Sequence, residues 1–290
     1  MTPSSSLAFF GKSRQDHNMT GILNFIDEAR KAGFRLLCHE KFAGYLSRLG
    51  VPDDYVPEIF EGVPDADCAV SFGGDGTFLR TARRLSGSPI PIAGVNTGHL
   101  GYLAHFSLDN PGELLSGLRD GSLRLEKRKL VSVSGEGIPD DFCRDALNEI
   151  AVQKDDSASM INVHVELDGF YLADYRADGL IVSTATGSTA YNLSAGGPIL
   201  QPLLDCMVLS PVAPHSLTLR PIVVSGSSCL RLVMSSRTGS FRLSVDGYSC
   251  TLPDSVALDV RTADYEVGVL STADDTFASS LREKLLWGRS

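Results

Sequence analysis

Short apolar runs alternate with helical patterns along the first hundred residues. The runs at residues 7–10, 34–38, 68–72 and 90–95 are typical of buried strands. Between them, apolar side chains three and four residues apart predict two helices, at residues 22–29 ending at Gly33 and at residues 42–49 ending at Gly50. A further helix is expected from Thr77 onward. This order predicts an α/β domain over residues 1–122, with a Rossmann-like parallel sheet covered by helices.

From about residue 123 the apolar positions alternate with period two, and turn residues recur. Strands are predicted at residues 130–134, 161–167, 170–175, 179–183, 222–224, 229–234, 241–245, 256–260 and 266–270. The dipeptide Asp168-Gly169 suits a type I′ hairpin turn. Residues 123–270 are therefore expected to form an all-β domain of the sandwich type. A last helix, with Phe277, Leu281 and Leu285 on one face, is expected to carry residues 271–290 back onto the first domain.

Composition limits the kinds of molecule that the protein is expected to bind. The chain has a formal net charge of −9, with 43% hydrophobic and 21% charged residues. An acidic globular chain of this kind argues against a nucleic-acid or anionic-membrane surface, because both need clustered Lys and Arg. No run is long enough for a membrane span or a signal-peptide core, and the six cysteines form no C-x-x-C pair. We expect a cytoplasmic protein.

The most informative stretch is the glycine turn at residues 73–76, which joins the predicted strand 68–72 to a helix. Glycine permits positive φ angles, and it lets a ligand approach the backbone. A strand, a glycine turn and a helix N-terminus together aim unpaired N–H groups at one point, as phosphate sites require. Asp75 in this turn would repel phosphates unless it holds a cation or takes up a proton, so it indicates a reaction as well as binding. The alternative is that Asp75 merely caps the helix.

Two nucleotide-binding motifs are incomplete. Gly11-Lys12-Ser13 resembles the end of a Walker A loop, but Ser6 stands where its first glycine belongs. The turn Gly74-Asp75-Gly76 does not complete G-x-G-x-x-G, because Leu79 occupies the third glycine position. Neither motif supports a P-loop or a Rossmann dinucleotide fingerprint.

Two further stretches carry unusual polar residues. Asn148-Glu149 interrupts an apolar strand at its middle, unless it is simply a solvated strand end. Residues 178–200, DGLIVSTATGSTAYNLSAGGPIL, run from a strand into a hydroxyl-rich helix start. Hydroxyl and N–H groups that converge there suit ribose, phosphate or carboxamide recognition, with a plain helix cap as the alternative.

Together these stretches resemble the NAD kinase family. GGDGT at residues 73–77, VNTGHLGYLA at 95–104, NE at 148–149, the long segment 178–200 and APHSLTLRPIVV at 213–224 occur in the family's order. Ala185 and Tyr102 stand where the family usually has proline and phenylalanine. The resemblance implies an enzyme that transfers the γ-phosphoryl group of ATP to the adenosine-ribose 2′-hydroxyl of NAD, giving NADP, with Mg²⁺ or another divalent metal. It also implies a homodimer or homotetramer whose subunits can share a site.

The resemblance assigns roles residue by residue. Asp75 matches the proposed proton acceptor and therefore the catalytic residue. The other matching positions imply contacts to NAD or nucleotide, while the metal ligands stay open; these positions are Gly73, Gly74, Gly76, Thr77, Asn148, Glu149, Arg176, Asp178, Thr189, Ala190, Tyr191, Asn192, Leu193 and Ser194. Ser159 and Tyr248 are included by spacing alone. Arg176 is further expected to favour NAD over NADH, by pairing with a carboxylate such as Asp178.

Two other functions are compatible with part of the pattern. A lipid kinase of the GGDGT type would need an apolar entry for an acyl chain and a basic surface, whereas this chain is acidic. A non-catalytic dinucleotide sensor would be expected to lose the acidic residue of the turn, yet Asp75 is present. Assaying NADP formation from NAD with Mg²⁺ and either ATP or polyphosphate separates these functions and identifies the donor.

Overall fold

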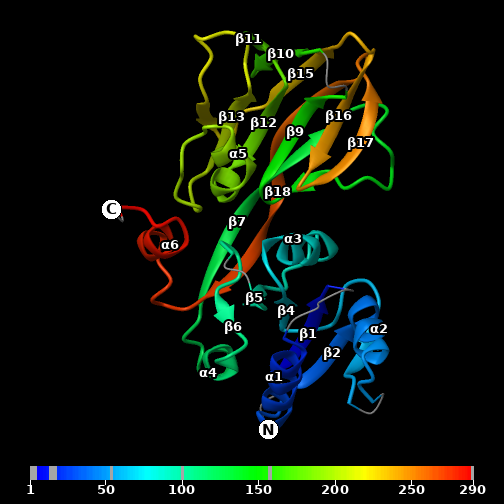
Figure 1. Cartoon of the computed structure of the whole chain (residues 1–290), viewed down its shortest axis with the longest axis vertical. Coiled ribbons are helices and arrows are strands. Elements are labelled where there is room, and N and C mark those ends of the chain that lie inside the picture. The colour runs from blue at the N-terminus through cyan, green and yellow to red at the C-terminus, as the bar shows by residue number, and fades with distance from the viewer. Residues whose placement is uncertain (1–4, 13–17, 53–54, 99–100, 156–158, 289–290) are drawn as a thin grey trace. The chain divides into compact units, whose positions relative to one another are not determined.

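The structure, a computed structural model, describes residues 5–12, 18–52, 55–98, 101–155 and 159–288 (Figure 1). It divides into two compact units, residues 1–127 with 267–290 and residues 128–266. Both limits fall within long strands, β7 (Arg124–Ser134) and β18 (Ala257–Ser271). The expected domain limits at residues 122 and 270 lie a few residues from these positions.

The first unit is built on a parallel sheet. Its strand order is β5-β4-β1-β2-β3, and β5 also pairs in parallel with β6 and with Val269 and Leu270 of β18. The strands are β1 (Ser6–Gly11), β2 (Arg35–His39), β3 (Glu58–Phe60), β4 (Cys68–Phe72), β5 (Ile92–Asn96) and β6 (Phe106–Ser107). The predicted parallel α/β sheet is confirmed. The three-residue strand β3 was not predicted, because it is too short to show an apolar alternation.

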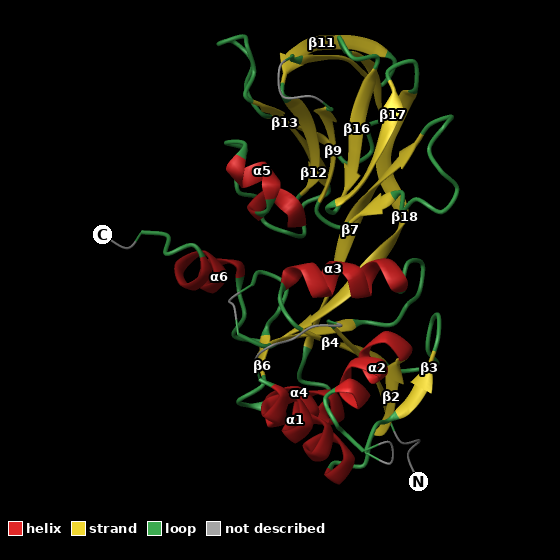
Figure 2. Ribbon diagram, turned by 45° about the vertical axis from the view of Figure 1, so that its right-hand side comes forward, coloured by secondary structure: helices red, strands yellow, loops and turns green. Residues whose placement is uncertain are grey.

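Helices cover both faces of this sheet (Figure 2). Alternate residues of a strand face opposite sides, and Phe9 and Phe72 point into a core with Phe25 of α1 and Phe42 of α2. On the other side, Thr81 of α3 donates a hydrogen bond to Ser71 of β4. The helices are α1 (Met19–Lys31), α2 (Glu40–Arg48), α3 (Asp75–Arg84), α4 (Pro111–Asp120), which lies beside α1, and α6 (Phe277–Lys284).

Packing explains the glycine of the incomplete Walker A sequence. A Cβ on Gly11 would overlap the ring of Phe42, so the close approach of α2 to the end of β1 requires glycine there. Lys12 is exposed, and Ser13 lies outside the described residues.

The second unit is antiparallel and consists of two sheets. One has the order β14-β13-β12-β9-β16-β17, and the other contains β11-β10-β15-β18 with β7 and β8. A single core draws buried residues from both sheets, including Val163 and Leu232 of one and Val182 and Leu243 of the other, which confirms the sandwich. The further strands are β8 (Asp145–Ala146), β9 (Glu149–Lys154), β10 (Ile161–Leu167), β11 (Phe170–Ala177), β12 (Gly179–Thr184), β13 (Cys206–Val212), β14 (Ile222–Ser225), β15 (Leu230–Ser235), β16 (Ser240–Val245) and β17 (Tyr248–Pro253).

Several strand predictions can be compared directly. The hairpin at Asp168-Gly169 is confirmed, with φ angles of 53° and 82°, as a type I′ turn requires. The two strands expected at 256–260 and 266–270 are wrong in number, since β18 is continuous over 15 residues.

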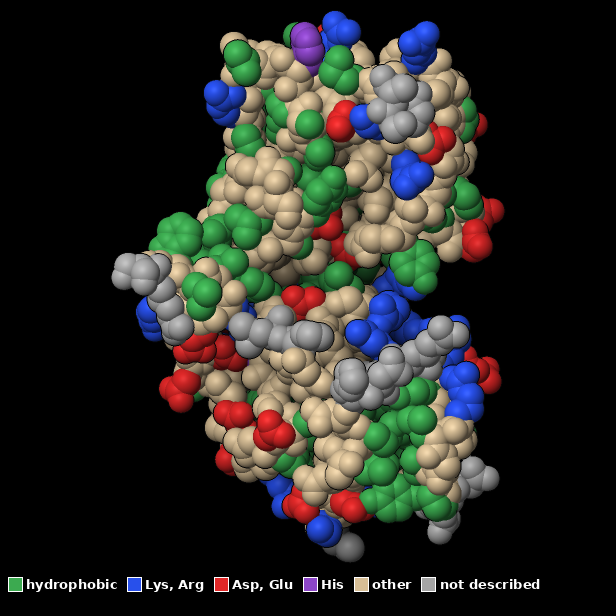
Figure 3. Space-filling model, in the orientation of Figure 1, with side chains coloured by type: hydrophobic (Ala, Val, Ile, Leu, Met, Phe, Trp, Pro, Cys, Tyr) green, Lys and Arg blue, Asp and Glu red, His purple; other side chains and the backbone are tan. Residues whose placement is uncertain are grey.

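The face of the molecule shown in Figure 3 carries both acidic and basic side chains on each unit. None of the helices that the structure describes combines the length and apolar character needed to span a bilayer.

Candidate active site

The glycine turn lies between β4 and α3, and its three glycines differ in what they require. Gly73 has a φ of 150°, and a Cβ there would overlap the Thr77 side chain, so the fold itself demands glycine. Gly74 has a φ of −95°, and a Cβ on it would meet no atom within 4 Å. Gly76 is almost as open, with only the Arg80 guanidinium 3.9 Å away. A side chain at Gly74 or Gly76 would therefore meet no close atom of the described protein.

Asp75 is the first residue of α3, and it does not cap its own helix. The N-cap is Gly74, without a side-chain bond. Instead, the Asp75 carboxylate accepts hydrogen bonds from the backbone N–H groups of Tyr102 (2.8 Å) and Leu103 (2.9 Å). Gly101 permits this approach, because a Cβ there would overlap the carboxylate. Each carboxylate oxygen accepts one of these bonds and keeps lone-pair capacity for a hydroxyl or a metal ion.

The start of α3 also offers hydrogen-bond donors. The N–H groups of Gly74, Asp75 and Gly76 have no acceptor within the described parts of the chain. Helix N-termini leave such donors free, and the helix dipole adds positive potential there. The arrangement suits a phosphate group beside a carboxylate.

In the second unit, Asn148 lies directly before β9 and Glu149 is its first residue, so the pair does not interrupt the middle of a strand, which corrects the expectation. They are not a solvated strand end either, since Asn148 is buried. The Asp246 carboxylate, in the turn between β16 and β17, accepts from the N–H groups of Leu147 (2.7 Å), Asn148 (2.9 Å) and Glu149 (3.0 Å). The backbone of the pair is thus fixed from a residue about a hundred positions away.

Burial, and after it the charge of Asp246, raise the pKa of Glu149 to about 8, although a hydrogen bond from the Tyr191 backbone N–H acts in the opposite direction. Its Oε2 atom is buried and has no partner among the described residues. At neutral pH this carboxyl is mostly protonated. It can therefore donate a hydrogen bond to a ligand, which an ionised carboxylate cannot do.

The segment 178–200 continues from β12 into a short 3₁₀ turn (Thr186–Thr189) and the helix α5 (Tyr191–Ser194). Most of its buried polar groups are satisfied internally. Thr184 donates to the Leu147 carbonyl (2.6 Å), and the Asn192 amide donates to two carbonyls and accepts from Ser210 (2.6 Å). Thr189, Ala190, Tyr191 and Leu193 are half-buried and Ser194 is exposed, so these positions retain accessible surface.

Residues 57–123 match the family model of the ATP-NAD kinase N-terminal domain, and residues 147–272 match that of the ATP-NAD kinase C-terminal domain. The chain belongs to the NAD kinase family. An NAD kinase of Porphyromonas gingivalis is 39% identical over 288 residues, which cover 97% of this chain and 98% of that protein. An NAD kinase of Bacteroides fragilis is 38% identical over 285 residues and 97% of each chain.

Two solved structures share the fold of this chain. A yeast NADH kinase solved with NADH has a TM-score of 0.89 at 22% identity, covering 100% of this chain and 89% of that one. An NAD kinase from Archaeoglobus fulgidus solved with ATP has a TM-score of 0.68 at 28% identity, covering 93% and 94%. At 22% identity, the similarity to the yeast structure establishes only that the fold is shared.

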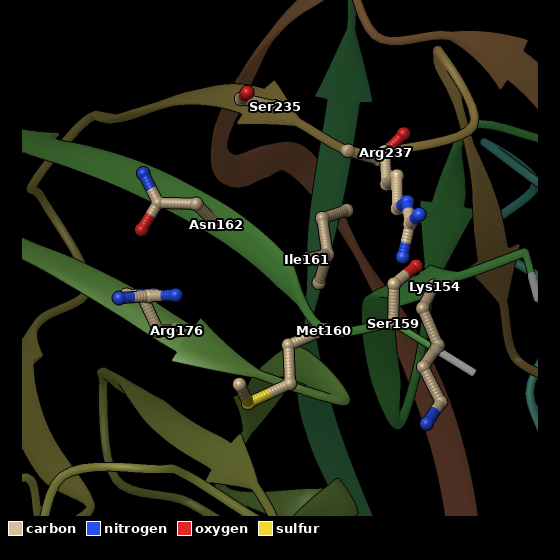
Figure 4. A pocket seen from close by; sticks show the side chains of 9 residues that line it. Lys154, Ser159, Met160, Ile161, Asn162, Arg176, Ser235 and Arg237 are labelled. Carbon is tan, nitrogen blue, oxygen red and sulfur yellow. The ribbon is translucent and has the colours of Figure 1, made fainter. Parts of the chain in front are cut away.

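Two residues that the NAD kinase resemblance suggests, Ser159 and Arg176, line one open pocket of about 550 Å³ (Figure 4). Lys154 and Arg237 contribute two further cations to its lining. The expected pairing of Arg176 with Asp178 is not found, because Asp178 forms its ion pair with Lys154 at 2.7 Å. Tyr248 lies elsewhere, exposed at the start of β17 and directly after the turn that contains Asp246.

Sequence reasoning missed four residues that shape these sites: Gly101, Asp246, Gly187 and Arg128. A Cβ on Gly187 would overlap the Asn148 backbone, and the buried Arg128 donates to the Thr186 hydroxyl (3.3 Å). Asp246 is followed by glycine, which is the same turn signal that predicted the hairpin at Asp168. That signal marks the turn, but it does not reveal the distant backbone that the carboxylate holds.

Proposed function

We propose that this enzyme phosphorylates NAD to NADP by transferring the γ-phosphoryl group of ATP to the adenosine-ribose 2′-hydroxyl, with Asp75 as the catalytic carboxylate. Membership of the NAD kinase family supports the reaction. The observation that carries the residue assignment is the position of Asp75. Two backbone N–H groups hold it beside free helix donors and a turn with open space over Gly74.

The chemistry follows from this arrangement. The ribose oxygen forms a bond to the γ-phosphorus while the bond from that phosphorus to the bridging oxygen breaks, and ADP leaves. Asp75 orients the hydroxyl and takes its proton, and the N–H groups of Gly74 and Gly76 hold phosphate oxygens. Because phosphoryl transfer has a loose transition state, positioning and charge stabilisation supply most of the rate enhancement.

The second-unit residues are proposed to bind the dinucleotide. Asn148 and protonated Glu149 would face ribose hydroxyls, with Glu149 as hydrogen-bond donor. The accessible residues of the 189–194 segment would contact the nucleoside, and we keep Asn192 in this set through its backbone, since its amide is fully engaged. Ser159, Arg176, Asp178 and Tyr248 complete the proposed contacts.

A divalent cation, Mg²⁺ by expectation, fits the residues present. Within the described ranges no group of three or more His, Cys, Asp or Glu side chains forms a metal cage. Mg²⁺ in kinases is held chiefly by substrate phosphates with one or two carboxylates, and Asp75 has the lone pairs to be one of them. Bound with ATP, the ion would neutralise charge on the transferred group.

Two properties of the whole protein are proposed from the resemblance: a homodimer or homotetramer, and a cytoplasmic location. Sedimentation equilibrium of the purified chain, with and without NAD, measures the first. A monomer that is fully active would contradict it.

The test of the catalytic assignment is Asp75→Asn. The variant should lower kcat by about two orders of magnitude or more, while calorimetry still detects NAD binding. Asp109→Asn, an exposed position of the same unit, is the matched control and should leave kcat unchanged. Near-normal turnover of Asp75→Asn would show that another group performs this role.

A further inference from the structure

The residue that holds Asp75 is itself held by the C-terminal helix. Tyr102 donates its N–H to the Asp75 carboxylate at 2.8 Å. Its carbonyl oxygen accepts from the Lys284 ammonium of α6 at 3.4 Å, and the same ammonium lies 5.7 Å from the centre of the Tyr102 ring. One peptide segment is therefore fixed on one side to the carboxylate and on the other to α6.

A second contact lies three residues further along this segment. The Nδ1 atom of His105 lies 2.6 Å from the Asp275 carboxylate, just before α6, and the two side chains are only 7% and 19% exposed. Burial alone would raise the pKa of Asp275, but the hydrogen bond and charge of His105 and the charge of Lys284 lower it overall. The Asp275 carboxylate is thus kept ionised against its burial.

The helix between these contacts is only partly packed against the rest of its unit. None of the residues of α6 is fully buried, although Phe277 and Leu281 are half-buried. A capping box between Thr276 and Ser279 fixes the start of the helix directly after Asp275. Both contacts are present together in the structure, so they hold both ends of segment 102–105 at once.

We propose that α6 is a positioning element for the catalytic carboxylate, acting through the C-terminal clasp formed by the Lys284–Tyr102 and His105–Asp275 contacts. The clasp fixes the N–H groups of residues 102 and 103, and these fix the Asp75 side chain. This inference rests on the catalytic role proposed for Asp75. Since a small displacement of a catalytic group costs rate more than affinity, loss of the clasp affects kcat and leaves KM for NAD nearly unchanged.

The test uses Lys284→Met, which keeps an unbranched side chain and removes the charge, with Arg282→Met as the matched control on the same helix. Arg282 is exposed. Lys284→Met is expected to lower kcat by about three- to tenfold with KM for NAD within about twofold, and Lys284→Arg is expected to restore most of the loss. Asp275→Asn, which acts on the other contact, is expected to change kcat in the same direction. The melting temperature of each variant is recorded alongside.

Combining Lys284→Met with Asp75→Asn shows whether the two act together. If Lys284 works through Asp75, the double variant is no slower than Asp75→Asn alone. The proposal would be overturned if the two substitutions lowered kcat by independent, fully multiplicative factors. It would also be overturned if the Lys284→Met enzyme had a lower melting temperature but a normal kcat. Equal behaviour of Lys284→Met and Arg282→Met would overturn it too. Near-normal turnover of Asp75→Asn would instead refute the proposed role of Asp75, so the two failures are distinguishable.

Discussion

Glu149→Gln is expected to stabilise the folded protein in alkaline solution and to change its stability little in acid. The native carboxyl has a pKa of about 8 instead of 4.5, because it is buried beside the Asp246 carboxylate. In the unfolded chain it ionises freely. Folding above pH 4.5 must therefore either take up a proton or bury a charge, and glutamine, which has nearly the same shape, avoids both costs.

The sign and size of the effect of Glu149→Gln on the free energy of unfolding follow from proton linkage. Between pH 4.5 and 8 the native state binds more protons at Glu149 than the unfolded state, so the free energy of unfolding falls as the pH rises through this range. Each pKa unit corresponds to about 1.4 kcal/mol, which gives a cost of about 3 kcal/mol at pH 7 and about 5 kcal/mol above pH 8. Any change in packing caused by the substitution is independent of pH, and it shifts all values equally.

The assay is urea unfolding of wild type and Glu149→Gln at pH 5 and pH 9, comparing the difference between the two proteins at each pH. That difference should grow in favour of the variant by several kcal/mol from the lower to the higher pH. Glu136→Gln, at an exposed loop position, is the control for the effect of a Glu-to-Gln substitution as such. A pH-independent difference for Glu149→Gln would show that the native carboxyl ionises like an exposed one.

Four further substitutions test other parts of the structure. Gly74→Ala should weaken ATP binding in calorimetry with little change in melting temperature. Gly73→Ala should lower the melting temperature, because Gly73, unlike Gly74, has a positive φ and a crowded Cβ position. Equal changes in melting temperature for the two variants would contradict this reasoning. Asp246→Ala should destabilise the protein by about 2–4 kcal/mol, since it leaves three backbone N–H groups unpaired. It should also lower the pKa of Glu149 in a carboxyl titration. An unchanged pKa would show that the charge of Asp246 does not contribute to the raised pKa of Glu149. Arg176→Gly is expected to raise NADH use relative to NAD in kcat/KM, as the NAD kinase resemblance implies for this position although Arg176 does not pair with Asp178. An unchanged ratio would show that Arg176 does not set the selectivity.

The elements with a regular apolar pattern were predictable from the sequence. Strand β4 was expected at residues 68–72 and lies there, and the Asp168-Gly169 turn has the backbone its type requires. β18 was predicted as two strands because charged and half-exposed residues between 261 and 266 interrupt its apolar alternation, although the backbone stays extended. Periodicity reports side-chain burial, and it therefore fails where a strand remains paired without a buried face.

The residue types of the candidate site were predictable from the sequence, but the hydrogen-bond partners of these residues were not. Asp75 was identified from its place in a glycine turn, yet the sequence could not show that its carboxylate binds N–H groups 27 and 28 residues away. The hydroxyls of the 178–200 segment were expected to recognise a ligand, but Thr184 binds the backbone of Leu147. Short polar side chains bond whichever backbone group tertiary packing brings near, and local sequence contains no record of it.

Asp75 and Asp246 make the same kind of contact, a carboxylate that accepts backbone N–H groups of a distant segment, and the sequence suggests this contact for neither residue. Each lies in or directly after a tight turn, and each carboxylate accepts backbone N–H groups of a distant segment, residues 102–103 in one unit and residues 147–149 in the other. Charged acceptors make the stronger hydrogen bonds, so a single side chain can fix the course of two or three residues. The consequences differ because the surroundings differ. Asp75 is left with accessible lone pairs beside free helix donors, while burial and the charge of Asp246 together raise the pKa of Glu149 and keep it protonated. The proposed roles of the two sites, Asp75 as proton acceptor and Glu149 as hydrogen-bond donor, would use these two states of a carboxyl group in the recognition and phosphorylation of a sugar hydroxyl.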